Sequence, residues 1–321
     1  MINHMGLSVV IPVYNEEENI EPLHDELAAK LQLLGVAYEV IFVNDGSRDG
    51  SLNKLMQLAQ NGAGGVQVID LRRNFGQTAA IAAGIDHAAG DIVVLMDADM
   101  QNDPADIASL LTKIQEGYDV VSGWRRDRKD VWLTRRLPSM IANRLISIVT
   151  GVHLHDYGCT MKAYRREILD EIRLYGEMHR FIPVFAAAAG ATITEIVVNH
   201  RPRLRGKSKY GIGRTFKVIL DLLTVKFLLD YRTTPMHLFG GVGLSMIVMS
   251  FLIIFAAFLN KWFNGISLIQ TPLPQLAATF LSLGLQSILL GLTTEVMVRT
   301  YHESQAKPTY VVRKVFKGDK N

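Results

Sequence analysis

The chain is poor in residues that define several protein classes. It contains one cysteine, Cys159, among 321 residues, which excludes a disulfide scaffold and a cysteine-rich zinc or iron–sulfur site. Charged residues make up 20% of the chain, below the roughly 25% of an ordinary soluble protein, and the net charge is only +3. We find no low-complexity segment or internal repeat, which excludes disordered and fibrous chains. The first twelve residues lack the features of a secretory signal peptide, so we expect none at this end.

Long apolar stretches lie near the C-terminal end. Residues 236–259 carry no formal charge, and a second uncharged stretch spans 262–294. A helix needs about 20 such residues to cross a bilayer, whereas buried core helices rarely have more than about 14. We therefore predict two transmembrane helices, about 236–259 and 274–297, in a membrane region of residues 233–298. A pair of buried core helices is the alternative.

Basic residues on either side of this region predict its orientation. Lys261 is the one basic residue between the apolar stretches, whereas many lie outside them: Arg214, Lys217, Lys226, Arg232, Arg299, Lys307, Arg313, Lys314, Lys317 and Lys320. Basic flanks remain on the cytoplasmic side. We expect a multi-pass protein of the cell (inner) membrane with both termini cytoplasmic, and residues 299–321 as a basic cytoplasmic tail.

The segment 213–232 has apolar residues at helical spacing and polar residues on another face. An amphipathic helix directly before a membrane span is typical of a helix that lies in the membrane interface. An ordinary surface helix of the preceding domain is the alternative. An anchor of this kind is compatible with a homo-oligomer, which the sequence leaves open.

Residues 1–212 have a different pattern. Short β-branched runs, among them 8–14, 38–45, 66–70, 91–97 and 119–124, alternate with helical stretches. This alternation predicts an α/β domain with a mostly parallel sheet, in which ligands bind outside the carboxyl ends of the strands. Polar side chains follow three of these runs, at Asn15 and Glu16, at Asp45 and at Asp97.

The strongest chemical signal is a pair of carboxylates after a buried strand. Asp97 and Asp99 follow the apolar run of residues 92–96. Two carboxylates this close repel each other, and burial disfavours both, so a divalent cation would relieve the cost. Hard oxygen ligands suit Mg²⁺ or Mn²⁺, and Mg²⁺ commonly takes its other ligands from substrate phosphates. A solvated acidic turn is the alternative.

Two further segments carry polar groups suited to anionic or nucleotide ligands. A turn at residues 44–47 presents Asp45, which can accept a hydrogen bond from a base N–H, although the same residues also make an ordinary tight turn. Two basic tracts, 122–136 and 201–217, can bind phosphates, or in the second case anionic lipid headgroups. With membrane spans in the same chain, we do not expect nucleic-acid binding.

Four motifs occur in a characteristic order: PVYNEEENI at 12–20, VNDGS at 43–47, RRNFGQTAAIAAGIDHAAGD at 72–91 and LMDADMQNDP at 95–104. Together they closely resemble family 2 glycosyltransferases of the GT-A fold. Within that family the chain resembles the polyisoprenyl-phosphate glycosyltransferases, the branch of the bactoprenol glucosyltransferases and dolichol-phosphate mannose synthases. The resemblance covers residues 8 to about 212, and the two-helix hairpin matches the bacterial subtype.

The resemblance implies roles for individual residues. The nucleotide pocket and donor contacts would be formed by Pro12, Tyr14, Glu16, Asp45, Asn74, Gly76, Gln77, Asp97, Arg203, Lys207 and Lys209. The metal and the donor diphosphate would be held by Asp97, Asp99 and Gln101. The acceptor phosphate would be bound by Arg125, Arg135 and Ser139, and Asp156, with Asp99 and Arg135, would lie at the reacting centre.

The implied reaction is the inverting, metal-dependent transfer of one sugar from a nucleotide diphosphate to polyprenyl (undecaprenyl) phosphate, for modification of cell-envelope glycans. UDP-glucose is the favoured donor by subtype; UDP-N-acetylglucosamine, an aminoarabinose donor and GDP-mannose remain open. A phosphate monoester has a second pKa near 6, so the acceptor is largely dianionic at neutral pH and needs little help from a base. We therefore expect Asp156 to position groups. A non-catalytic, membrane-tethered sugar-nucleotide binder and a soluble nucleotidyltransferase are the alternatives.

Overall fold

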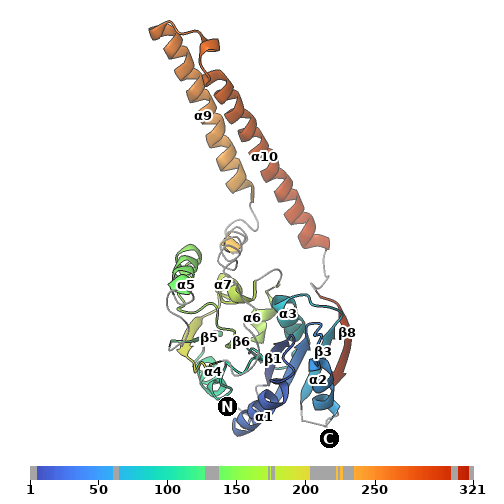
Figure 1. Ribbon diagram of the computed structural model, residues 1–321. Helices are drawn as coiled ribbons and strands as arrows, with labels where there is room; N and C mark the ends of the chain where they lie inside the picture. The colour runs from blue at the N-terminus through green and yellow to red at the C-terminus, as the bar shows by residue number, and fades with distance from the viewer. Residues whose placement is uncertain are drawn as a thin grey trace. The chain divides into compact units, whose positions relative to one another are not determined.

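The computed structural model describes residues 6–60, 65–126, 137–172, 174, 178–202, 222, 225–226, 235–304 and 310–317. The chain forms two compact units: one of Met1–Val225 with Pro308–Asn321, and one of Lys226–Lys307. The larger unit contains the sheet, and the smaller contains two long helices (Figure 1).

The sheet has the strand order β7-β5-β6-β4-β1-β2-β3-β8. Its strands are β1 (Leu7–Val13), β2 (Tyr38–Asn44), β3 (Val66–Leu71), β4 (Ile92–Leu95), β5 (Val120–Trp124), β6 (Lys162–Arg165), β7 (Ile193–Val197) and β8 (Val312–Lys317). The four central strands, β4, β1, β2 and β3, are parallel, so their carboxyl ends meet at one edge of the sheet. That edge is where the polar residues after β1, β2 and β4 gather.

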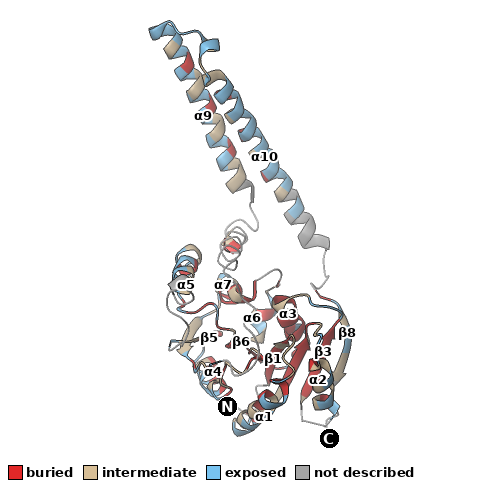
Figure 2. Cartoon of the chain, in the orientation of Figure 1, coloured by how far each residue is buried: buried red, intermediate tan, exposed pale blue. Residues whose placement is uncertain are grey.

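Helices join the strands and cover the sheet. They are α1 (Ile20–Leu33), α2 (Ser51–Gln60), α3 (Gln77–His87), α4 (Asp106–Gln115), α5 (Leu137–Thr150), α6 (Arg166–Asp170) and α7 (Ile182–Ala188), with a 3₁₀ turn, η3 (Met178–Phe181), before α7. In α1 the buried residues are Ile20, Leu23, Leu27 and Leu31, three or four positions apart, which places one apolar stripe against the core. The central strands are buried on both faces, as Figure 2 shows in red, which explains their nearly continuous apolar sequences.

The predicted α/β fold with a mostly parallel sheet is confirmed, with differences at the sheet's two sides. Strand β6 inserts antiparallel between β4 and β5, and β7 pairs parallel with β5. Neither β6 nor β7 was expected from the sequence. Both are short, and β6 carries the charged residues Lys162 and Arg165, so local pattern does not mark them as strands.

The C-terminal end also differs from expectation. The sequence predicts a sheet domain that ends at residue 212 and a separate basic tail at 299–321. Instead, β8 pairs antiparallel with β3 at the edge of the sheet, where Figure 1 shows it in red. Its mixture of basic residues with Val312, Val315 and Phe316 suits an edge strand, and Phe316 packs against the core. The chain therefore returns to the first unit after the two long helices.

The smaller unit consists mainly of α9 (Pro235–Asn264) and α10 (Leu273–Ser304), with a 3₁₀ turn, η4 (Leu268–Gln270), between them. Both extend beyond the predicted 236–259 and 274–297. The helices approach closely where two glycines face each other: a Cβ on Gly243 would lie 2.6 Å from the carbonyl oxygen of Gly284. Ser250 and Ser287 donate hydrogen bonds across the pair.

The outer faces of this helix pair are apolar. Phe251, Phe255 and Leu289 are all more than half exposed. The segments Leu238–Asn264 and Leu273–Thr294 are long and apolar enough to cross a membrane, and few of their residues are buried inside the protein. The predicted interfacial helix, 213–232, lies outside the described residues apart from Leu222, Val225 and Lys226.

Candidate active site

The loops after β1 and β2 are tied to each other. Asn15 adopts a positive φ of 52°, and its N–H donates to the Ser47 hydroxyl at 3.0 Å. In return, the N–H of Arg48 donates to Asn15 Oδ1 at 2.8 Å. The two turns that carry the first two motifs therefore form one rigid ledge at the carboxyl edge of the sheet.

The other predicted residues of the first motif lie on this ledge. Pro12 is in β1, and Tyr14 follows the strand; both are half-buried. Glu16 accepts a hydrogen bond from the Asn19 side chain at 2.8 Å, and its N–H donates to the Ser51 hydroxyl. Glu16 therefore organises its own loop, and its contact with a nucleotide stays a prediction.

Asp45 joins the ledge to the loop between β3 and α3. Its buried carboxylate accepts hydrogen bonds from the backbone N–H groups of Phe75, at 2.7 Å, and Gly76, at 3.0 Å. Burial raises the pKa of Asp45, and these two hydrogen bonds act in the opposite direction. Gly76 has a φ of 97°, a conformation that only glycine adopts readily, so it permits the bend that aims both N–H groups at Asp45. The predicted base contact of Asp45 would use its remaining acceptor capacity.

Gly46 sets how closely this turn approaches the neighbouring loop. A Cβ there would lie 2.4 Å from the carbonyl carbon of Arg73 and 2.5 Å from the Asn74 nitrogen. Gly35 has the same φ of 64° but nothing within 4 Å of such a Cβ, which makes it a matched control.

We expect Gly46→Ala to push the β3–α3 loop away and to lower the transfer rate on the order of a hundredfold, because a shift of about 1 Å at a site can cost that much. Gly35→Ala should keep the rate and lose only about 1–2 kcal/mol of stability from its left-handed backbone. Titration with UDP and steady-state transfer assays measure the two effects. Equal activity of the two variants would contradict this reading of Gly46.

The β3–α3 loop also reaches the paired aspartates. Gln77, the first residue of α3, donates from its side-chain nitrogen to Asp97 Oδ1 at 2.9 Å. Two motifs separated by 20 residues are thereby joined, and the start of α3 lies next to the carboxylates after β4. Asn74 is exposed in the middle of the β3–α3 loop.

The carboxylates of Asp97 and Asp99 lie close together and are shielded from solvent. Burial, together with the charge of Asp99, raises the pKa of Asp97 to about 6. A hydrogen bond from Thr160 and the charge of Arg125 act in the opposite direction. Asp99 is buried, and its Oδ1 accepts the backbone N–H of Gln101 at 3.2 Å.

This donor set fits a hard divalent cation. The repulsion that raises the pKa of Asp97 is relieved by a bound cation, and carboxylate oxygens are suitable ligands. Among the residues that the structure describes, no three His, Cys, Asp or Glu side chains cluster as a ready metal site. The remaining ligands would have to come from substrate or water. The predicted third ligand, Gln101, directs its side-chain nitrogen to the carbonyl of Arg201 at 3.4 Å.

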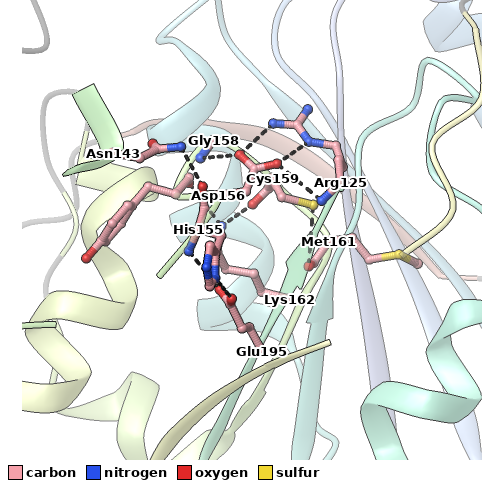
Figure 3. A network of polar contacts seen from close by, with 10 residues as sticks. Arg125, Asn143, His155, Asp156, Gly158, Cys159, Met161, Lys162 and Glu195 are labelled. Atoms are coloured by element: carbon pink, nitrogen blue, oxygen red, sulfur yellow. Dashed lines mark hydrogen bonds and ion pairs between the residues drawn. The ribbon is translucent and has the colours of Figure 1, made fainter. Parts of the chain in front are cut away.

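Arg125 and Asp156 form a bidentate ion pair on the other side of the paired aspartates. The guanidinium donates from Nε to Oδ2 at 2.7 Å and from Nη2 to Oδ1 at 2.9 Å, as Figure 3 shows. Both side chains are largely buried, with exposed fractions of 14% and 4%. The family resemblance predicts that Arg125 binds the acceptor phosphate and that Asp156 lies at the reacting centre. The structure brings the two residues together, so any acceptor contact would use the edge of Arg125 that faces away from Asp156.

A buried lysine supports the loop that carries Asp156. The ammonium of Lys162 donates to the backbone carbonyls of Tyr157, at 3.2 Å, and Cys159. Burial lowers the pKa of Lys162 and raises that of the Cys159 thiol, so Cys159 has little thiolate character. Lys162 was not predicted as a site residue from the sequence. The signal that could have identified Lys162 was a lysine at the start of the short segment KAYR, residues 162–165.

His155 marks the outer rim of this region. Its ring stacks on Trp124, with centroids 4.2 Å apart, and its Nδ1 contacts Glu195. Asn143 of α5 donates to the carbonyl oxygen of His155 at 2.7 Å (Figure 3). Helix α5 is thereby fastened to the loop that carries Asp156.

The remaining predicted residues divide into two groups. Ser139 is partly exposed near the start of α5. The others, Arg135, Arg203, Lys207 and Lys209, lie outside the described residues, so their roles stay predictions.

Comparisons with known proteins identify the family of this chain. Residues 8–173, more than half of the chain, match the model of the family described as glycosyl transferase family 2. The chain is 41% identical over 318 residues to the dodecaprenyl-phosphate galacturonate synthase of Rhizobium johnstonii, covering 98% of this chain and 94% of that protein. It is 37% identical over 316 residues to the undecaprenyl-phosphate 4-deoxy-4-formamido-L-arabinose transferase of an Enterobacter species, covering 96% and 93%.

Solved structures match the sheet domain. The glucosyl-3-phosphoglycerate synthase of Mycobacterium tuberculosis, in complex with Mn²⁺, UDP and glucosyl-3-phosphoglycerate, superimposes with a TM-score of 0.54 at 20% identity, over 70% of this chain and 80% of that one. At this identity the likeness establishes the fold. The GT-A architecture expected from the motifs is confirmed.

Proposed function

The chain belongs to glycosyl transferase family 2, and we propose that it transfers one sugar from a nucleotide diphosphate donor to a polyprenyl phosphate in the cell membrane. The observation that carries this proposal is the hydrogen bond from Gln77 to Asp97. It joins the loop that contacts Asp45 to the carboxylate pair, which lies within the electrostatic reach of Arg125. One continuous site can therefore hold a base, a diphosphate and a reacting centre.

Each part of the site has a task in this reaction. Asp45 and the ledge would bind the nucleoside, and Asp97 and Asp99 would hold a divalent cation. When bound, the cation would offset the charge on the departing diphosphate. Asp156 orients Arg125 through two hydrogen bonds, which keeps a rigid cation beside the carboxylates. Since the acceptor phosphate is largely dianionic at neutral pH, Asp156 acts by positioning.

A lipid acceptor is supported by the surface of α5. Met140, Ile141 and Ile148 are 55%, 61% and 68% exposed, although the opposite face of this helix already packs on the domain through Ile146. Such apolar exposure suits contact with a polyprenyl chain. Ser139 lies at the start of this surface, and Asn143 connects it to the Asp156 loop.

The nature of the sugar is the finer part of the proposal. The motif resemblance favours UDP-glucose, whereas the two relatives are named for galacturonate and for 4-deoxy-4-formamido-L-arabinose. We propose a UDP-linked pyranose and place UDP-galacturonate beside UDP-glucose at the head of the donor panel, because the galacturonate relative matches this chain over nearly its full length.

The test is a donor panel with the full-length protein and a short-chain polyprenyl phosphate. Radioactive sugar in a butanol-extractable lipid is the expected product for one donor. A chain that binds UDP but forms no lipid product with any donor would be a non-catalytic binder. A product in which a nucleotide is transferred would indicate a nucleotidyltransferase.

Chain connectivity supports the proposed orientation in the membrane. The chain up to Val225 and the strand after α10 belong to the same unit, in which β8 pairs with β3. Two membrane crossings between them would leave both ends of the hairpin on one side. With the basic flanks, this side is the cytoplasm.

Cysteine labelling tests the orientation. The native Cys159 is buried, so it gives little background. A cysteine in place of Asn264, at the exposed end of α9, should react with an impermeant thiol reagent on intact cells, and one in place of the exposed Lys314 should react only after lysis. The reverse pattern would overturn the orientation.

A further inference from the structure

A bulge in β8 directs one side chain toward the donor loops. In the β3–β8 ladder Asp70 faces Lys314 and Leu71 faces Val312, so Arg313 is an extra residue without a partner in the register. A β-bulge re-aims the side chain of its extra residue and is common beside functional sites. The Arg313 guanidinium contacts two groups of β3 and the loop that follows: it donates to the carbonyl oxygen of Arg72 at 3.0 Å and lies 3.5 Å from Asp70 Oδ2.

Asp70 connects Arg313 to the ledge formed by the turns after β1 and β2. Its carboxylate is buried, and Oδ1 accepts the side-chain N–H of Asn44 at 2.8 Å. Asn44 in turn accepts the backbone N–H of Ser47 at 3.2 Å. Ser47 also accepts the N–H of Asn15. Four consecutive contacts therefore lead from Arg313 to the turns after β2 and β1.

The start of the β3–α3 loop and the end of helix α3 are held by residues of β8 and the two residues directly before it. At the start of the loop, the Arg72 N–H donates to the carbonyl of Val311 at 3.0 Å, and the Arg72 carbonyl accepts from Arg313. Toward the end of α3, the hydroxyl of the buried Tyr310 donates to Asp86 at 2.8 Å. This is the loop whose Phe75 and Gly76 N–H groups bind Asp45.

A cavity of about 230 Å³ lies between these elements. Its lining includes Gly46, Ser47, Arg72, Asn74 and Arg313, so the turn after β2, the β3–α3 loop and the bulge of β8 share one polar space. The side chain of Arg313 is 57% exposed, and its removal does not open the hydrophobic core. Its contribution is therefore to the position of the loops.

We infer that Arg313, supplied by the strand that follows the membrane hairpin, is a positioning residue for the nucleotide side of the donor site. It neutralises the buried Asp70 and fixes the Arg72 carbonyl, which together hold the β3–α3 loop in the position where it meets Asp45. The donor site is complete only when β8 is docked on β3. This inference rests on the proposed use of Asp45 and its loops for the nucleotide.

The test compares Arg313→Ala, Arg313→Lys and Lys314→Ala in the full-length protein, by calorimetric titration with UDP and by transfer kinetics. Lys314→Ala is the matched control, since it removes an equal charge from the next residue of β8, whose ammonium lies over the Phe316 ring. We expect Arg313→Ala to raise the Kd for UDP and the donor KM about tenfold, the scale of one charged hydrogen bond. The acceptor KM and kcat should stay within about twofold. Arg313→Lys should recover part of the loss, because an ammonium can pair with Asp70 but cannot reproduce the fork.

Two results would overturn the inference. One is UDP binding that Arg313→Ala and Lys314→Ala leave equally unchanged. The other is an Arg313→Ala variant in which donor KM, acceptor KM and melting temperature change together, as expected of a merely structural edge strand. If UDP binding depends on Arg313 and yet no donor gives a lipid product, the proposed transfer fails and the positioning role stands.

Discussion

Asp99→Asn is expected to reduce the transfer rate by about a hundred- to a thousandfold, the cost of losing one major electrostatic stabiliser of a transition state. Asparagine keeps an oxygen and the shape of the side chain but removes the charge. Asp99 is buried at the carboxyl edge of the sheet beside Asp97, whose pKa is raised first by burial and then by the charge of Asp99. The substitution relieves this repulsion, so the domain should remain folded while it loses the cation.

The measurement combines activity with binding. EDTA should silence the wild-type protein, and Mg²⁺ or Mn²⁺ should restore it. The affinity for UDP should depend on metal in the wild type and become independent of metal in Asp99→Asn. Asp25→Asn, which changes an exposed carboxylate of α1, should behave as the wild type. Undiminished transfer in EDTA would refute metal dependence.

The second large effect concerns the Arg125–Asp156 pair. Arg125→Ala removes both guanidinium hydrogen bonds from the buried carboxylate, which keeps the hydrogen bond from the Gly158 N–H at 3.1 Å. Breaking one partner of a buried pair costs about 3–5 kcal/mol of stability, because the other charge stays uncompensated. Transfer should be lost as well, because the guanidinium is the fixed cation beside the carboxylate pair.

A double variant separates these two effects. Arg125→Ala combined with Asp156→Ala removes both charges, so it should be more stable than Arg125→Ala alone yet remain inactive. Thermal unfolding in detergent gives the coupling free energy, with Arg126→Ala as the control at the next, exposed position. Stability losses that simply add would show that the two side chains do not stabilise each other.

Several features of the protein were determined by the sequence because their signals are local. The strand before Asp97 and Asp99 is marked by five apolar residues followed by two carboxylates, and the alternation of such runs with helical stretches predicts a parallel sheet. The length of the uncharged stretches is likewise sufficient to identify two helices able to cross a membrane. Four motifs in order were sufficient for the family, which the comparisons confirm.

The tertiary structure decided which residues meet. Asp156 and Arg125 are 31 residues apart, and the sequence placed them in two separate roles. No local pattern encodes their ion pair, because it depends on how the loop before β6 folds over the end of β5. The buried Lys162, which supports that loop, is likewise visible only once Tyr157 and Cys159 present their carbonyls to it.

The end of the chain shows the same division most clearly. Composition identifies residues 299–321 as basic, and a basic segment after a membrane helix is ordinarily a solvated tail. Whether it becomes a strand depends on an unpaired sheet edge. That edge is offered by β3, and Arg72, directly after β3, lies 241 residues before Arg313. Backbone pairing over such a separation depends on two edges meeting in space. The sequence therefore identifies this segment as basic, whereas the position of Arg313 beside the donor loops follows only from the fold.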